Sequence, residues 1–275
     1  MDISNEVVRV PHDPKDRDLK IKNSGVCVTT RSILTFRRIL EAQASATFQA
    51  KGILMIEYFG RKYVEVDANF FAPPAAKVAP KLIGCVLHHD NRGAETAIIL
   101  IDVEAYGGGN DRASHFHPEN RSLRNKAAKN LTPPGTARIH GSRNMWGLDI
   151  VCGEEGQGST VLIRAGLPVL GIEIMAERRS QADAADRVVK ERARGYERRL
   201  SNAPFNLGEA MGLSPVLDGA SLLGHPFRLH RPVNPVSGLL IGRRVRVTQD
   251  VDRLWRWGHP DHQAWLRDKF KNVSE

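Results

Sequence analysis

A carboxylate, an aromatic ring and an imidazole lie close together in the segment 97–117, which reads AIILIDVEAYGGGNDRASHFH. The segment opens with an apolar, mostly β-branched run, and this composition predicts a buried strand. Glu104 and Tyr106 follow the run, and three consecutive glycines come before His115 and His117. A strand that ends in a carboxylate and opens into a glycine-rich loop can hold a reactive group rigidly at a cleft. The segment therefore offers a candidate general base, an aromatic face and an imidazole.

The same residues also have a simpler explanation. Glu104 could be a solvated residue at a strand end, beside glycines that only form a turn. The glycines lack GxGxxG spacing and a following capped helix, so they do not predict a nucleotide cofactor. Adjacent His88 and His89 do not predict a metal site, because neighbouring side chains of a strand point to opposite faces. The pattern alone leaves a catalytic site and a plain strand end as equal alternatives.

Composition and charge limit the partners. The chain has 275 residues, 41% of them hydrophobic, and a formal net charge of +9 at pH 7. Such a chain can bury one large core. Lys and Arg that neutralise phosphates release counterions, so the charge favours nucleic acid, although some basic proteins bind acidic proteins instead.

The cysteines and the apolar runs bear on the compartment. Cys27, Cys85 and Cys152 are too widely separated for a disulfide framework or a CxxC metal pair, and they indicate a reducing cytosol. No apolar run reaches the roughly 20 residues of a membrane span. The polar N-terminus is not typical of a signal peptide.

The elements that must position the candidate residues can be placed coarsely. Residues 1–65 are expected to form an N-terminal extension, partly flexible, with one short helix from Ser32 to Ala42. A helix is predicted over 75–82, with Gly84 after its end. Strands are predicted over 85–89, 95–103, 148–152 and 159–165, a helix or helix pair over 171–195, and a strand with outward-facing arginines over 243–247.

Short motifs recur along the chain in a fixed order: Val103-Glu104-Ala105-Tyr106, Ala113-Ser114-His115, Pro134-Gly135-Thr136, Val161-Leu162-Ile163-Arg164-Ala165 and Gly171-Ile172-Glu173-Ile174-Met175. In this order they resemble the alkyladenine (3-methyladenine) DNA glycosylase family, over roughly residues 67–260. The ordered set is more specific than any one of its motifs.

The resemblance implies an α+β fold in residues 66–275: a single domain with a curved antiparallel sheet flanked by helices, similar to the C-terminal domain of methionyl-tRNA formyltransferase. It implies a monofunctional enzyme of base-excision repair that hydrolyses the N-glycosidic bond of alkylated or deaminated purines, of the 3-methyladenine, hypoxanthine or ethenoadenine type. The nucleotide must be flipped out of duplex DNA, because the stack hides the glycosidic carbon. We expect a cytoplasmic, nucleoid-associated monomer that binds damaged double-stranded DNA and no membrane, cofactor or metal.

The resemblance also implies a role for each site residue. Glu104 matches the carboxylate that deprotonates the attacking water and stabilises the sugar cation, and Arg164 helps to hold that water. Tyr106 stacks on the flipped base. His115 forms part of the opposite wall and hydrogen-bonds the base or a 5′ phosphate. No lysine stands at the position of Glu104, so no Schiff-base lyase step is expected.

Some positions depart from the family's usual pattern. His140 stands where a second base-stacking tyrosine is usual, and Asp149, or Ile150 in an ungapped alignment, replaces an asparagine that discriminates against guanine. Arg143 stands where the intercalating tyrosine is usual. The residues that could enter the DNA as a wedge are then Arg143, Asn144 and Met145. These departures concern the substrate range more than the chemistry of Glu104.

Two functions of other classes remain open. The altered wedge strand suits a catalytically weak DNA-binding protein on the same fold. The formyltransferase-like fold and the basic balance suit an RNA-binding module. Release of a damaged purine from duplex DNA distinguishes an enzyme from a binder, and preference for duplex RNA at matched salt would favour the third function.

Overall fold

A computed structural model of the chain describes residues 48–50, 53–120, 132–182 and 196–270. The helix predicted from Ser32 to Ala42 lies outside these residues. So does the part of the 171–195 prediction that follows residue 182. Of the residues described, no helix is both long and apolar enough to cross a membrane.

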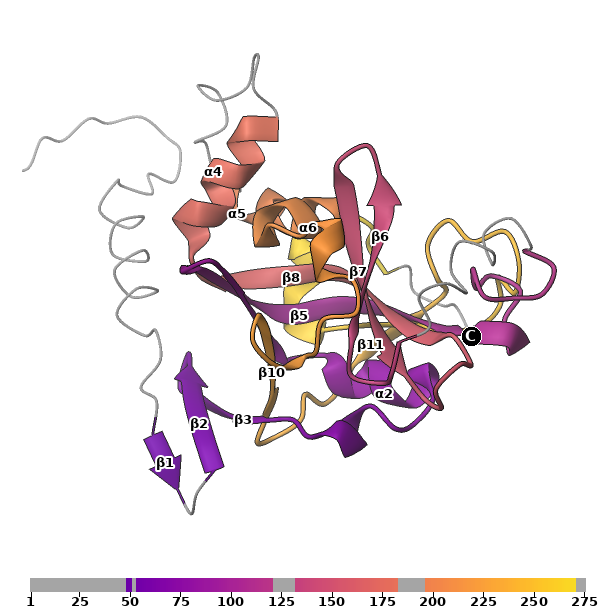
Figure 1. Cartoon of the computed structure of the whole chain (residues 1–275), viewed down its shortest axis with the longest axis horizontal. Helices are drawn as coiled ribbons and strands as arrows, with labels where there is room; N and C mark the ends of the chain where they lie inside the picture. The colour runs from indigo at the N-terminus through magenta and orange to yellow at the C-terminus, as the bar shows by residue number, and fades with distance from the viewer. Residues whose placement is uncertain (1–47, 51–52, 121–131, 183–195, 271–275) are drawn as a thin grey trace, which may run out of the picture. The chain divides into compact units, whose positions relative to one another are not determined.

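An open antiparallel sheet is the centre of the fold, with strands in the order β1-β2-β3-β10-β4-β5-β8-β7-β6 (Figure 1). β12 pairs with β5 and β11, and β9 pairs with β10. The strands are β1 Phe48–Ala50, β2 Ile53–Tyr58, β3 Arg61–Glu65, β4 Val86–Asn91, β5 Ala94–Gly107, β6 Ala137–Ser142, β7 Met145–Cys152, β8 Ser159–Leu170, β9 Leu223–Gly224, β10 Phe227–Pro232, β11 Leu240–Gly242 and β12 Arg256–Gly258. β2 and β3 precede residue 66, and β3 joins the rest of the sheet through β10.

A few helices complete the domain. They are α2 Ala75–Leu82, α4 Ile172–Ala182, α5 Tyr196–Leu200 and α6 Pro204–Met211, with short 3-10 turns η1 Ala68–Phe70, η2 Gly108–Asn110, η4 Pro215–Leu217 and η5 Pro260–Trp265. α2 packs against β5 and β8, and α6 packs against β7 and β8. The predicted helix over 75–82 is confirmed, and Gly84 follows it with a φ of 86°. The expected α+β domain built on an antiparallel sheet is confirmed.

Two apolar clusters cover the two faces of β5. Ile98 and Leu100 belong to one cluster, whereas Ile99 and Ile101 belong to the other, as the alternation of side chains along a strand requires. The pairing with β8 is irregular between Leu100 and Asp102. After this bulge Val103 lies in the first cluster. The bulge therefore turns Asp102 and the residues in step with it to the opposite face.

Three strand predictions can be compared with the structure. Those over 85–89 and 95–103 are confirmed, and β5 runs on to Gly107 because β8 and β12 pair with its second half. The strand over 243–247 is wrong, because this segment is irregular. Its Arg244 is buried rather than outward-facing.

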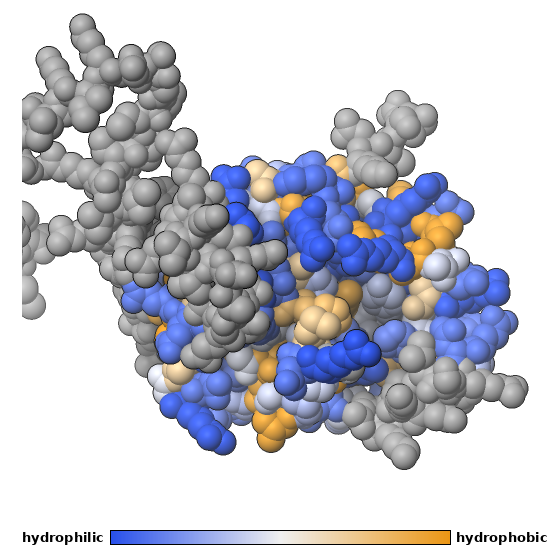
Figure 2. All heavy atoms as spheres, turned by 90° about the horizontal axis from the view of Figure 1, so that it is seen from above, coloured by the Kyte–Doolittle hydropathy of each residue, from blue (hydrophilic) through white to orange (hydrophobic). Residues whose placement is uncertain are grey.

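On the face seen in Figure 2, hydrophilic side chains cover most of the described surface, and apolar side chains form small separate patches. Single exposed apolar residues are normal on a protein surface.

Candidate active site

The register of the sheet places polar residues from several strands in one row. Glu104 on β5 is paired with Leu162 on β8, and Leu162 is also paired with Asp149 on β7. Asp149 is in turn paired with Arg138 on β6, and Glu104 with Arg256 on β12. Directly opposed residues of antiparallel strands project to the same face. The row therefore lies on one face of the sheet, with partly exposed Leu162 between the two carboxylates.

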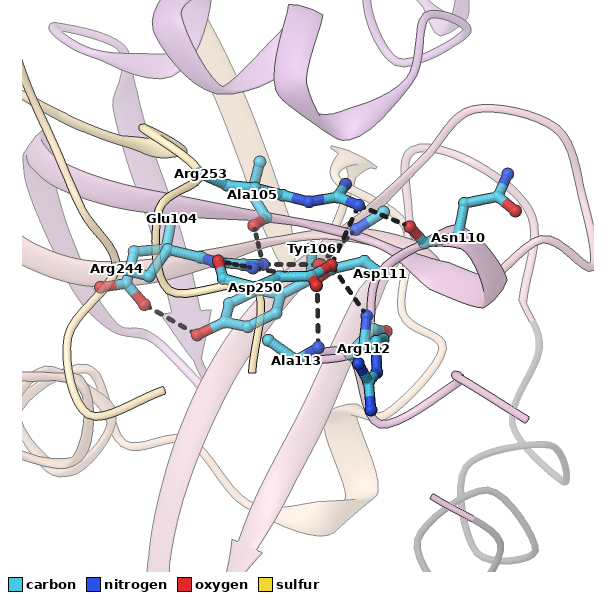
Figure 3. Close-up of polar contacts among 12 residues, drawn as sticks. Glu104, Ala105, Tyr106, Asn110, Asp111, Arg112, Ala113, Arg244, Asp250 and Arg253 are labelled. Carbon is cyan, nitrogen blue, oxygen red and sulfur yellow. Dashed lines mark hydrogen bonds and ion pairs between the residues drawn. The ribbon is translucent and has the colours of Figure 1, made fainter. Parts of the chain in front are cut away.

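The carboxylate of Glu104 is fully buried and held by three donors. The hydroxyl of Tyr106 donates to Oε2 at 2.8 Å, as Figure 3 shows. Oε1 accepts the backbone N–H of Val245 at 2.7 Å and lies 3.2 Å from Nη1 of Arg164. Burial raises the pKa of Glu104 above its ordinary value, although the charge of Arg164 acts against this. The site thus holds an oriented carboxylate that is a stronger base than a solvated one.

Arg164 is itself fixed by carboxylates around it. Its Nε lies 3.3 Å from Oδ2 of Asp102, and its Nη2 donates to Oδ2 of Asp268 at 2.7 Å. Arg256 binds Asp102 through Nε and Nη2, at 2.9 and 2.8 Å. Sequence analysis missed Asp102, Arg256 and Asp268. Only Asp102 carried a signal, since it precedes Glu104 by two positions on the strand and shares its face.

The glycine-rich loop after β5 is held down by a buried ion pair. Asp111 accepts from both terminal nitrogens of Arg244, and it also accepts the backbone N–H groups of Gly107 and Ala113 (Figure 3). Burial tends to raise the pKa of Asp111, but its hydrogen bond with Arg244 lowers it below the ordinary value. Cζ of Arg244 lies 4.8 Å from the ring centroid of Tyr106. The pair therefore fixes both the loop and the tyrosine.

Asp149 and the residues around it form a second polar group. Asp149 accepts from Nη1 of Arg138 at 2.9 Å and lies 3.0 Å from Nε2 of His140. The rings of His115 and His140 are 6.4 Å apart, edge to face. Burial would raise the pKa of Asp149, but the charges of His140 and Arg138 lower it to about 2. Asp149, and not Ile150, faces the site, because Ile150 belongs to the apolar cluster of the other face.

The predicted wedge residues lie at the turn of the β6–β7 hairpin. Arg143 and Asn144 have φ values of 53° and 62°, and two positive values between paired strands define a type I′ turn. Both side chains are exposed, and Met145 is 50% exposed. Only the part of β7 from Asp149 onward pairs with β8. The turn therefore extends past the neighbouring strand.

Two other sequence candidates lie apart from these contacts. Nδ1 of His117 accepts the backbone N–H of Glu119. His88 packs against Tyr58, whereas His89 stacks on Phe227, so the two histidines do face opposite sides of the sheet. In the part of the chain that the structure describes, no cluster of three or more His, Cys, Asp or Glu could hold a metal ion.

Comparisons with known proteins define the class first. The family model described as Methylpurine-DNA glycosylase (MPG) matches residues 69–263, and the protein is a DNA glycosylase, a hydrolase of DNA repair. The chain belongs to the methylpurine-DNA glycosylase family. The resemblance seen in the sequence is thereby confirmed.

Relatives from three bacteria illustrate the similarity, and each is named "Putative 3-methyladenine DNA glycosylase". The relative from Rhodopseudomonas palustris strain HaA2 is 33% identical over 194 residues, which span 69% of this chain and 84% of the relative. The relative from Chlorobaculum parvum is 31% identical over 70% of this chain and 85% of its own length. The relative from Frankia casuarinae is 32% identical over 69% of this chain and 85% of its own length.

Proposed function

We propose that this glycosylase, carried by residues 66–275, removes alkylated or deaminated purines from duplex DNA by flipping the nucleotide. It would act alone on the base, as a monofunctional enzyme of base-excision repair in the cytoplasm. The observation that carries the proposal is the held carboxylate of Glu104, on the same sheet face as Asp149. The likeness of the curved sheet to the formyltransferase C-terminal domain is part of the same proposal.

The flipped base would lie over Leu162, the partly exposed residue between the two carboxylates. Tyr106 would stack on it, and an aromatic face attracts the cationic bases that alkylation produces. His115 and His140 would form the facing wall, with Asp149 behind His140. Unstacking costs a few kcal/mol and is easiest for a damaged base.

Glu104 would take a proton from the attacking water, and its raised pKa supports that role. Arg164 touches the same carboxylate and would help to orient the water. The negative charge of Glu104 would stabilise the cationic sugar as the base departs. The described side chains that contact Glu104 are a tyrosine and an arginine, which supports hydrolysis without a covalent amine intermediate.

Arg143, Asn144 and Met145 would enter the duplex where the nucleotide leaves it. Side chains inserted between base steps unstack and bend DNA. A tight turn with exposed side chains is suited to such insertion, because its backbone conformation is set before binding.

The test is incubation of the protein with duplex DNA that carries one hypoxanthine, 1,N6-ethenoadenine or 3-methyladenine, followed by alkali to reveal abasic sites. Glu104→Gln should lower the rate of release by roughly 10² or more and leave DNA binding intact. Glu155→Gln, at an exposed position in the β7–β8 turn, is the matched control and should behave as the wild type. Tight binding without release from all three duplexes would identify a binding protein instead. Preference for duplex RNA at matched salt would identify an RNA-binding module.

A further inference from the structure

A histidine and an aspartate on the wall of the site form a pair that the hydrolysis described above does not use. Nε2 of His140 lies 3.0 Å from Oδ1 of Asp149, and Arg138 donates to the other oxygen of that carboxylate at 2.9 Å. The imidazole lies over Gly147, its partner on β7, where a Cβ would come within 2.9 Å of the ring. Glycine therefore leaves the room that this ring position requires.

The pair and Glu104 stand on either side of one bound base. Glu104 and Asp149 are both cross-strand partners of Leu162, so they flank it on the same face. Neighbouring strands are about 4.8 Å apart, which separates the two residues by about 10 Å. A purine above Leu162 would have its sugar bond toward one carboxylate and its ring edge toward the other.

His140 has one nitrogen left for a ligand. Nε2 is engaged with Asp149, whereas Nδ1 has no hydrogen-bond partner among the residues described. Asp149, Arg138, His115 and Asp218 are the charged or titratable groups that face the imidazole. Burial tends to lower the pKa of His140, but the carboxylate of Asp149 raises it above the usual value. The protonated imidazole has an N–H on each nitrogen.

We propose, on the basis of the glycosylase function above, that His140 is the general acid that protonates the departing purine, with Asp149 as its positioning residue. Breaking the C1′–N bond leaves the electron pair on the purine. A neutral purine such as hypoxanthine then departs as an anion unless a donor supplies a proton. N7-methylguanine is already cationic and departs neutral without one.

The step balances in atoms and charge. The oxygen of water bonds to C1′, Glu104 takes one proton from that water, and the C1′–N bond breaks. Nδ1–H of His140 gives its proton to a ring nitrogen of the purine. His140 ends neutral and Glu104 protonated, and exchange with solvent restores both.

The test compares single-turnover excision of hypoxanthine and of N7-methylguanine from the same duplex. His140→Phe keeps an aromatic face and removes the proton. It should slow hypoxanthine release by about 10² or more and change N7-methylguanine release by about threefold at most. For the wild type, hypoxanthine excision should fall at alkaline pH as His140 loses its proton. Asp149→Asn should move this fall to lower pH.

Equal losses on both bases would show a stacking role and overturn the proposal, as would no loss on either. If His140→Phe does not fold, His140→Gln gives the same comparison with a side chain that can still donate to Asp149. Failure of the wild-type protein to release either base would overturn the glycosylase proposal itself.

Discussion

Replacing Asp111 by asparagine would remove the negative charge opposite Arg244 and leave the shape of the side chain nearly unchanged. Both side chains are fully buried, and the carboxylate accepts from both terminal nitrogens of the guanidinium. It also accepts two backbone N–H groups, those of Gly107 and Ala113. The substitution therefore leaves a buried positive charge without its partner and weakens the loop that follows Tyr106.

The size of the effect follows from this burial. Removal of one partner from a buried ion pair costs about 3–5 kcal/mol, a large part of the total stability of about 5–15 kcal/mol. With a urea dependence of about 2 kcal/mol per M, the unfolding midpoint should fall by about 2 M. The neighbouring pair Arg243–Asp252 has an N–O distance of 2.9 Å but side chains 64% and 81% exposed. Asp252→Asn should therefore change the free energy of unfolding by at most about 1 kcal/mol.

The measurement is urea unfolding of the wild type and both variants, followed by circular dichroism. A third variant, with Asp111→Leu and Arg244→Met combined, replaces the pair by apolar side chains. It should recover much of the loss, because no buried charge is then left unpaired. If Asp111→Asn shifts the midpoint no more than Asp252→Asn does, burial does not set the strength of this pair and the reasoning fails.

Two further predictions concern pH and the wedge. The rings of His88 and His230 lie 5.2 Å apart, and burial lowers both pKa values from 6.5 to about 4. As the pH falls through this window the unfolded chain binds more protons, so the free energy of unfolding should fall by up to about 1.4 kcal/mol per pH unit for each histidine. Urea titrations should show a shallower slope for His88→Gln, and an unchanged slope would contradict this. Arg143→Ala should slow excision from duplex far more than from single-stranded DNA, with exposed Arg231→Ala as the control, and equal slowing on both substrates would refute the wedge role.

The elements that were predicted correctly depend on local patterns. The apolar runs of β4 and β5 and the glycine after α2 are readable because strand composition and helix ends are set by neighbouring residues. The segment 243–247 misled because its alternation of arginine and valine is typical of a strand. Arg244 finds Asp111 at a distance of 133 positions along the chain. An ion pair of this separation leaves no mark in a local pattern.

The sequence by itself determined which chemical groups are present: Glu104 at the end of an apolar run, Tyr106 two positions on, and the histidines after the glycines. It also determined the family, through the order of its motifs. Only the tertiary structure decided which face these groups share. A bulge before Asp102 turns the end of β5 over, and the register with β8 and β7 brings Asp149 into the row of Glu104. Strand pairing decides this because a shift of one residue moves every following side chain to the other face.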